Sequence, residues 1–377
     1  MMSNQPYLSV CFPAYNKSDR LKKNLASLLN ACGDDIEIVV VDNVSEENLE
    51  EVCKNFNDPR ISYYRNEEPI VAQANWIRSI RLAKGQWALL MMDRDLINGK
   101  GIPPLMEELK KCKAFGAGKA SYYADGTDKI YAKCPKIGSA TKHRAGAVDT
   151  LLAVNWNYHP SGNLYNKDFL KLSEDCESAI MQNPRLKENT YLMLRPAWNH
   201  GLLVIQTDMI YTPWYKHLAA YKSGFKSSHV NMKGVNYYGY YTLEGFLKYI
   251  REDLEEIQKL GLSSEEKKEF CVRAYNGGYI KERFLALISI SRGSYIWKHY
   301  NEKYKYRTWK EEKKLASELC ENYKEAVKTF LGDDAEDVLS EIEPIRVEWS
   351  THMKLTIAAI PVIGPFLLKV KHWLVRS

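Results

Sequence analysis

Two aspartates, Asp93 and Asp95, are the residues whose type and spacing most clearly suggest chemistry. They directly follow the apolar run 87–92, which has the length of a buried strand. In an open α/β sheet, ligands bind outside the carboxyl ends of the strands. Carboxylates also suit hard divalent cations, which prefer oxygen ligands and often share them with phosphate. We therefore predict that Asp93 and Asp95 hold Mn²⁺ or Mg²⁺ beside a phosphate-bearing ligand.

The first hundred residues alternate strand and helix signals, and these elements must position the two acids. The run 36–41 is continuously apolar and β-branched, as expected of a parallel strand buried on both faces. Pro13 is expected to end the first strand. The order β-α-β-α-β-α-β predicts a parallel-sheet nucleotide-binding architecture. Strands are predicted at 7–12, 36–41, 61–64 and 87–92, and helices around 18–29, 49–56 and 76–84.

Composition limits the function classes. The 377 residues, 45% hydrophobic and 27% charged, describe an ordinary folded chain of two domains. A net charge of +6, from 53 basic and 47 acidic residues, does not indicate a dedicated nucleic-acid binder, so no nucleic-acid partner is predicted. The eight cysteines include no Cys-x-x-Cys pair, which argues against a zinc site and suits a reducing compartment. We expect a cytoplasmic protein.

The apolar pattern divides the chain into parts. Residues 1–238 are predicted to form the α/β domain, and 239–352 a helical module, because apolar residues recur there at helical spacing. The tail, 353–377, contains a run of about 14 apolar residues that is too short to span a membrane. Basic residues follow it, which suits a helix lying in the membrane interface. We predict peripheral contact with the inner face of the cell membrane; docking of the tail on its own domain is the alternative.

Three ordered segments resemble the family 2 glycosyltransferases. Ser9–Asn16 resembles their opening strand and Val39–Ser45 their second-strand signature. Asn75, then Ala83-Lys84-Gly85 and Met92–Asp95, complete the same order. The likeness covers the first 100 residues well and weakens toward residue 215. It implies a GT-A fold, which is a Rossmann-like, mixed, mainly parallel sheet with flanking helices, with 1–100 as the nucleotide-binding half and 101–238 as the acceptor half.

The resemblance also implies a nucleoside-diphosphate sugar donor, with a UDP-sugar favoured, and transfer with inversion at the anomeric carbon. Asp93 and Asp95 would meet the ribose and the metal–diphosphate complex. Arg94, between them, would contact the diphosphate or lie exposed. Others of the nucleotide-sugar site would be Pro13, Ala14 and Tyr15 around the base, with Asp42, Asn43 and Asn75 beside them.

A catalytic base is also needed, because the acceptor hydroxyl loses a proton as it attacks. In the family this base lies in an acidic motif before a helix, and 186–192 is the best match, with Glu188 as the candidate. Asn189 is the alternative match to the position of the family's catalytic Asp; in that case Glu188 substitutes or the base lies elsewhere. Asp175 and Glu177 are the reserves. Any of four histidines is a candidate third metal ligand, against an ordinary polar or core role: His159, His200, His217 and His229.

The predicted function is transfer of a hexosyl or related group to a hydroxyl of a glycan or lipid-linked acceptor in surface polysaccharide synthesis. A sugar-1-phosphate nucleotidyltransferase is an alternative, although the segment 13–16 is not a glycine-rich triphosphate loop. A second alternative is an inactive relative that scaffolds a polysaccharide assembly complex, because position 189 is Asn where a second acid is expected. The oligomeric state is left open.

Overall fold

The computed structural model describes residues 5–124, 140–156, 159–185, 187–212, 243–277, 279–281, 284, 308–350 and 352–353. They fall into two compact units, one within residues 1–235 and the other within 236–377. The predicted tail lies outside the described residues, apart from its first residue.

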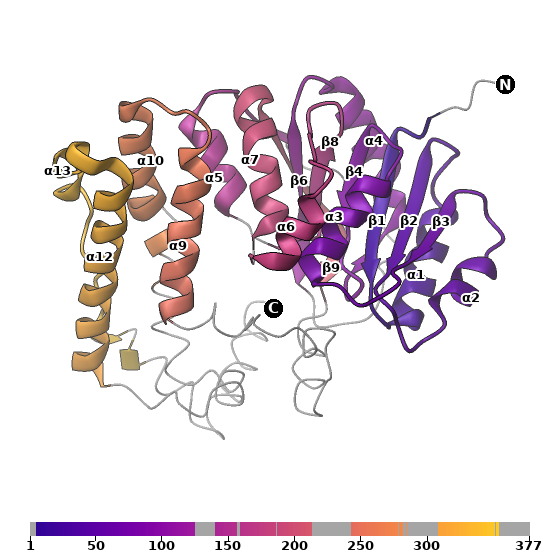
Figure 1. Ribbon diagram of the computed structural model, residues 1–377, viewed down its shortest axis with the longest axis horizontal. Coiled ribbons are helices and arrows are strands. Elements are labelled where there is room, and N and C mark those ends of the chain that lie inside the picture. The colour runs from indigo at the N-terminus through magenta and orange to yellow at the C-terminus, as the bar shows by residue number, and fades with distance from the viewer. Residues whose placement is uncertain are drawn as a thin grey trace, which may run out of the picture. The chain divides into compact units, whose positions relative to one another are not determined.

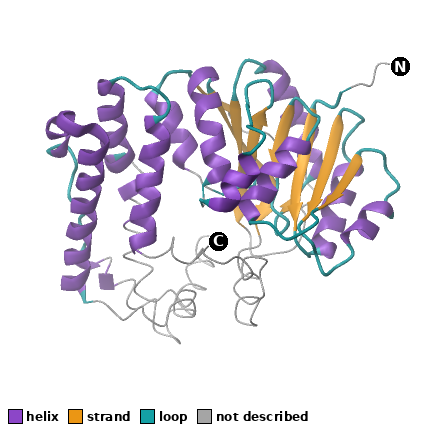
Figure 2. Cartoon of the chain, viewed as in Figure 1, coloured by secondary structure: helices purple, strands orange, loops and turns teal. Residues whose placement is uncertain are grey.

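The first unit is built on a nine-stranded mixed sheet with helices on its faces (Figures 1 and 2). Its order is β3-β2-β1-β4-β8-β6-β9-β5, and β7 pairs with β9. Neighbours among β1 to β4 run parallel, whereas β8 is antiparallel to both β4 and β6. This confirms the predicted fold class. The strands are β1 Leu8–Ala14, β2 Ile36–Asp42, β3 Ile61–Arg65, β4 Trp87–Leu90, β5 Leu96–Ile97, β6 Ala117–Ala124, β7 Ala140–His143, β8 Asn163–Asn166 and β9 Leu202–Thr212.

Helices follow most strands and bury their apolar stripes. Val10 and Ile38, which point to one face of the sheet, belong to a core that includes Leu25 and Leu105 from two helices. A third helix, α3, packs on β1, β2 and β4. The helices of this unit are α1 Ser18–Leu29, α2 Leu49–Lys54, α3 Ala72–Leu82, α4 Ile102–Lys111, α5 Val148–Trp156, α6 Cys176–Gln182 and α7 Glu188–His200.

The prediction that Pro13 ends the first strand is wrong. β1 continues to Ala14, and Pro13 pairs in register with Val41 of β2. In a parallel ladder, alternate residues direct their N–H and C=O groups to opposite neighbours. The carbonyl of Cys11 accepts from Met91 N, so Pro13 faces the same side, beyond the end of β4. The missing N–H of Pro13 therefore removes no ladder hydrogen bond.

The second unit is helical in its described part. Two of its helices begin with capping boxes, formed by Ser263 with Glu266 and by Thr308 with Glu311. Its core contains Phe270, fully buried, and Tyr323, which stacks on Tyr275 with ring centroids 4.8 Å apart. The helices are α9 Leu243–Gln258, α10 Ser264–Asn276, α12 Trp309–Leu331 and α13 Glu336–Leu339. None of the described helices is long and apolar enough to cross a bilayer.

Candidate functional site

The candidate site lies at the carboxyl edge of the sheet, where β1, β2 and β4 end together. Ala14 at the end of β1 pairs with Asp42 at the end of β2, and Asn43 N donates to the Ala14 carbonyl over 2.8 Å. β4 ends at Leu90, whose carbonyl accepts from Gly162 N over 3.0 Å, so the turn before β8 reaches the same edge. The acid-bearing loop therefore leaves the sheet between β1 and β8.

Asp93 is tied to the end of β1. Its Oδ2 accepts a hydrogen bond from Tyr15 N over 3.0 Å, which joins two residues that the sequence assigned to one ligand. Removal from water raises the pKa of the Asp93 carboxyl to about 6, although the Tyr15 N–H, Arg94 and Lys17 lower it. The nearby Asp95 adds to the rise. A cation or a positively charged neighbour stabilises the ionised form of such a desolvated carboxylate.

Asp95 is fully buried, with an exposed fraction of 0%. Its Oδ2 accepts from Ser161 Oγ over 2.5 Å and lies 3.6 Å from His159 Nε2. Its Oδ1 is buried and has no hydrogen-bond partner in the part of the chain that the structure describes. Burial lowers the pKa of His159, with Arg94 acting in the same direction and Asp95 opposing it. The imidazole is thus neutral near pH 7, and Asp95 Oδ1 accepts no hydrogen bond from the described residues.

The backbone at this edge adopts conformations that are rare for residues other than glycine. Asn16, Lys17 and Val44 have φ angles of 57°, 64° and 60°. For a β-branched residue such as Val44 this is a strained conformation, and such strain concentrates at functional sites. The Asn16 side chain accepts from Glu46 N and Glu47 N over 2.9 and 3.2 Å, which joins the loops that follow β1 and β2.

Asp42 lies at this edge, but its carboxylate is engaged within the protein. Oδ1 accepts from Ser45 N over 2.8 Å and from Ser45 Oγ over 2.5 Å. Oδ2 accepts from Tyr63 OH over 2.7 Å and also pairs with Arg65, whose side chain is 43% exposed. Since Asp42 itself is fully buried, the polar group that it presents at the surface of this edge is the Arg65 guanidinium.

Asn43 and Asn75 belong to a buried amide network. Asn43 Oδ1 accepts from Asn66 Nδ2 over 2.8 Å and from Ile70 N over 2.9 Å. Asn66 Nδ2 also donates to Asn75 Oδ1 over 3.0 Å, and Asn75 Nδ2 donates to the Val41 carbonyl over 3.0 Å. The network thus joins the ends of β2 and β3 to α3 and also holds the backbone of Ile70.

The two candidates for the catalytic base have contrasting environments. Glu188, 6% exposed, begins α7, and both of its oxygens accept from Arg185, Oε2 from Nε over 2.9 Å and Oε1 from Nη2 over 3.1 Å. Asn189 is fully buried, and neither its Oδ1 nor its Nδ2 has a hydrogen-bond partner among the residues described. α7 runs toward β9, whose first residue Leu202 lies at the amino edge, so α7 begins on the carboxyl-edge side.

The remaining candidates are placed unevenly. Glu177 pairs with Arg81 over 2.6 and 2.8 Å, whereas Asp175 is exposed before α6. Among the histidines, His159 lies beside Asp95, but His200 ends α7 and stacks on Phe169 with ring centroids 3.8 Å apart, away from the acids in the fold. The other two, His217 and His229, lie outside the described residues.

The acids at this edge fit a divalent cation of the magnesium type. Such ions keep several waters and bind through one or two carboxylates together with substrate phosphates. The buried, unpartnered Oδ1 of Asp95 and the partly exposed Asp93 are two such ligands. Among the described residues there is no group of three or more acidic, histidine or cysteine side chains that could hold an ion. Water and phosphate would therefore have to complete the coordination.

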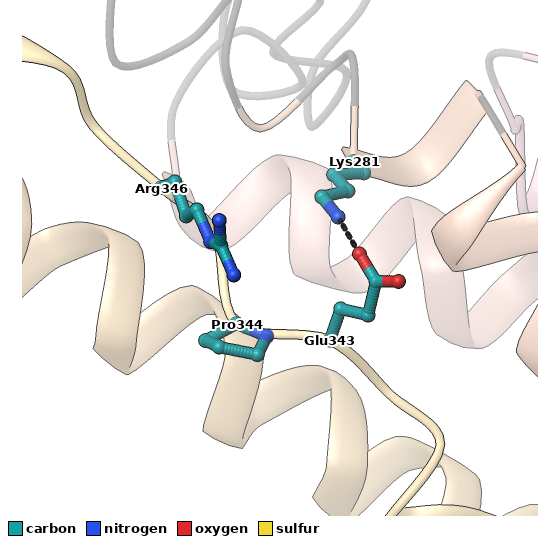
Figure 3. A pocket seen from close by; sticks show the side chains of 4 residues that line it. All are labelled: Lys281, Glu343, Pro344 and Arg346. Atoms are coloured by element: carbon teal, nitrogen blue, oxygen red, sulfur yellow. Dashed lines mark hydrogen bonds and ion pairs between the residues drawn. The ribbon is translucent and has the colours of Figure 1, made fainter.

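Figure 3 shows a surface pocket in the second unit, with a volume of about 510 Å³. It is lined by Lys281, Glu343, Pro344 and Arg346, and Lys281 donates to Glu343 over 2.8 Å. None of the residues predicted from the sequence lines it. The pairing neutralises one of its two cations, and we assign it no role in the chemistry.

Comparison with known proteins fits this geometry. Residues 9–172 match the family described as glycosyl transferase family 2. This part of the chain is therefore similar to a family 2 glycosyltransferase domain. The matched residues run from β1 to just beyond β8 and include Asp93, Asp95 and Ser161.

Two relatives of this part of the chain are bacterial proteins. It is 30% identical over 96 residues to the putative colanic acid biosynthesis glycosyl transferase WcaA of Escherichia coli, covering 25% of this chain and 34% of that protein. It is 32% identical over 96 residues to the abequosyltransferase RfbV of Salmonella typhimurium, covering 24% of this chain and 28% of that protein. The similarity thus spans about a third of each relative.

Solved structures extend the likeness of the fold over most of the chain. The crystal structure of S. aureus TarS 1-349 aligns with a TM-score of 0.52 at 12% identity, covering 93% of this chain and 90% of that one. The complex of TarS 1-349 with UDP-GlcNAc gives a TM-score of 0.51 at 12% identity, with the same coverage. Together with the mixed sheet, this confirms the predicted GT-A fold.

The residues that hydrogen-bond to Asp42 and Asp95 were not predicted from the sequence. Ser45, Tyr63 and Arg65 surround Asp42, and Ser161 holds Asp95. The turn 159–162 was visible as His-Pro-Ser-Gly, but its approach to Asp95 depends on β8 pairing with β4. Arg65 could have been suspected, because a charged residue that ends a strand beside Asp42 suits the carboxyl edge.

Proposed function

We propose that the chain transfers a sugar from a nucleoside-diphosphate sugar, a UDP-sugar in particular, to a hydroxyl of a glycan or lipid-linked acceptor in surface polysaccharide synthesis. The observation that supports this best is the buried Oδ1 of Asp95, which has no hydrogen-bond partner among the described residues and lies at the edge where α/β sheets bind ligands. The names of WcaA and RfbV support the reaction class, and the TarS complex with UDP-GlcNAc supports the donor class.

Asp93 and Asp95 would hold Mn²⁺ or Mg²⁺, which when bound compensates negative charge on the departing diphosphate. Pro13, Ala14 and Tyr15 would border the base, with the Asn43 and Asn75 network shaping that pocket. Asp42 would act through Arg65 and Tyr63, because its own oxygens are engaged. Arg94 and Lys17 lie close enough to lower the pKa of Asp93, and they would offer positive charge to the phosphates.

Glu188 is proposed as the base that takes the proton of the acceptor hydroxyl, with inversion at the anomeric carbon. Both Glu188 oxygens accept hydrogen bonds from Arg185, and each keeps a further lone pair that can take this proton. The same pair, with the unpartnered Asn189 amide, favours the inactive scaffold as the second candidate function.

A panel of nucleotide sugars, with and without Mn²⁺, separates these functions. The transferase should gain thermal stability from one donor when metal is present, because a ligand of the folded state raises its apparent stability. It should also release the nucleotide slowly by hydrolysis. Tight binding without release from any donor would favour the scaffold, and no binding at all would reject both.

A further inference from the structure

Ser161 makes two hydrogen bonds that connect the end of β4 to Asp95. Its Oγ accepts from Met92 N over 2.8 Å and donates to Asp95 Oδ2 over 2.5 Å. The direction of each bond is fixed by chemistry, because a backbone N–H only donates and leaves the hydroxyl proton for the carboxylate. Ser161 is 1% exposed, so water does not compete for either bond.

The position of Ser161 is itself fixed by the glycine that follows it. Gly162 has a φ of 94°, and a Cβ at this position would lie 2.1 Å from the Ala120 carbonyl oxygen. Gly162 N donates to the Leu90 carbonyl over 3.0 Å. The turn therefore packs between β4 and β6 with no room to shift, and it sets the serine hydroxyl at a defined point beside the acid loop.

The backbone of Asp95 is held as well, so the hydroxyl decides how its carboxylate is turned. Asp95 N donates to the Met92 carbonyl over 3.1 Å, and Asn24 Nδ2 donates to the Asp95 carbonyl over 2.9 Å. With Oδ2 bound to Ser161, Oδ1 is the oxygen left buried without a partner. Leaving such an oxygen unpaired is costly, and a bound cation removes that cost.

We propose that Ser161 is a positioning residue, which orients Asp95 so that Oδ1 is presented to the divalent cation and its diphosphate. The inference rests on the proposed function and adds a residue that acts through Asp95 without touching the substrate. Groups that hydrogen-bond to metal ligands orient them, and their removal weakens metal binding about 10–100-fold.

The chain contains a matched control at the opposite edge of the same sheet. Ser9 Oγ accepts from Gly85 N over 2.9 Å and donates to Glu37 Oε2 over 2.7 Å. Ser9 is also fully buried and also joins a backbone N–H to a carboxylate. Ser9→Ala therefore removes the same pair of bonds as Ser161→Ala, but far from the candidate cation site in the fold.

The experiment measures Mn²⁺ affinity in the presence of UDP, by the loss of the free-ion electron paramagnetic resonance signal, in the full chain and both variants. Urea unfolding measures the stability of each. We expect Ser161→Ala to weaken Mn²⁺ binding about 10–100-fold, Ser9→Ala to leave it within about twofold, and both to lose similar stability. Ser161→Thr, which keeps the hydroxyl, should restore most of the affinity.

Wild-type affinity in Ser161→Ala, or equal weakening in Ser9→Ala, would overturn the positioning role and leave the proposed function standing. Should Ser161→Ala fail to fold, Ser161→Cys takes its place, because a thiol is a weaker donor of similar shape. Unchanged affinity in that variant would again overturn the role. If the wild-type chain binds no Mn²⁺ with UDP, the proposed function fails, and the inference fails with it.

Discussion

Each edge of the sheet contains a buried acid that is hydrogen-bonded to a buried serine. The two acids differ in how many of their oxygens have a hydrogen-bond partner among the described residues. At the amino edge, Glu37 Oε2 accepts from Ser9 Oγ and Lys84 N over 2.7 and 2.9 Å, and Oε1 accepts from Ser62 Oγ over 3.3 Å. At the carboxyl edge, Asp95 keeps Oδ1 buried without a partner.

Both acids are buried, and each accepts a hydrogen bond from a buried serine whose hydroxyl also accepts one from a backbone N–H next to β4. Since buried polar atoms are nearly always paired, an unpaired carboxylate oxygen calls for an explanation. Burial of an acid therefore does not by itself indicate function. The two edges differ in hydrogen-bond partners: among the described residues, both oxygens of Glu37 have one, whereas Asp95 Oδ1 has none.

The largest expected effect comes from neutralising one acid at each edge. Asp95→Asn should lower turnover on the order of 10³-fold, because the developing charge on the diphosphate loses its compensation. Glu37→Gln should leave turnover near wild type and lower the free energy of unfolding by about 1–3 kcal/mol. Steady-state kinetics and urea unfolding of both variants check this. Equal losses of turnover would erase the distinction between the edges.

Glu188 provides a second test of this comparison, because both of its oxygens accept hydrogen bonds, as those of Glu37 do. As the base, Glu188→Gln should reduce kcat about 10²-fold or more while UDP binding stays within about twofold. Glu177→Gln breaks a similar arginine pair on a neighbouring helix and should preserve kcat. Wild-type turnover in Glu188→Gln would place that residue with Glu37 as structural, and the reverse pattern would move the base to Glu177.

Asp42 is a carboxyl-edge acid whose oxygens are all engaged, so stability should respond first. Asp42→Asn should lower the free energy of unfolding by about 2 kcal/mol or more, because it weakens the bonds to Tyr63 and Arg65. Asp35→Asn, which breaks a half-exposed pair with Lys110, should cost less than about 1 kcal/mol. Urea unfolding and UDP titration measure both. Loss of UDP affinity without loss of stability would indicate direct contact of Asp42 with the nucleotide.

The smallest effect concerns Asp93 in the metal-free protein. Its pKa of about 6 lies above the ordinary value of 3.8, so the protonated form is favoured in the folded state. Its contribution to stability is therefore complete below about pH 4 and is lost as the pH rises through about 6. In a chelator, Asp93→Asn should be more stable than wild type at pH 7.5, by up to about 2 kcal/mol, and this advantage should vanish near pH 4. A constant difference across this range would contradict the raised pKa.

Much of this fold was predictable from local patterns. The apolar run of β2 and the placement of Asp93 and Asp95 after β4 follow from periodicity and from the rule for strand ends. The resemblance to the family added the order of motifs, and Gly85 now has a physical reason, since a Cβ there would lie 2.7 Å from Ser9 N.

What the sequence did not reveal depends on long-range pairing. Ser161 lies 66 residues after Asp95 in the sequence and reaches it only because β8 runs antiparallel to β4. Arg185 lies three residues from Glu188, but the bidentate geometry depends on the turn before α7. Pro13 was misread because the side of β1 that it faces depends on where β4 ends.

Anomalous scattering from a crystal of the full chain soaked with UDP and Mn²⁺ would locate the cation directly. A manganese peak is expected within about 2.5 Å of Asp95 Oδ1, with Asp93 and the diphosphate oxygens completing a shared site. A well-occupied UDP with the peak remote from both aspartates, or with Asp95 Oδ1 still unpartnered, would contradict this expectation.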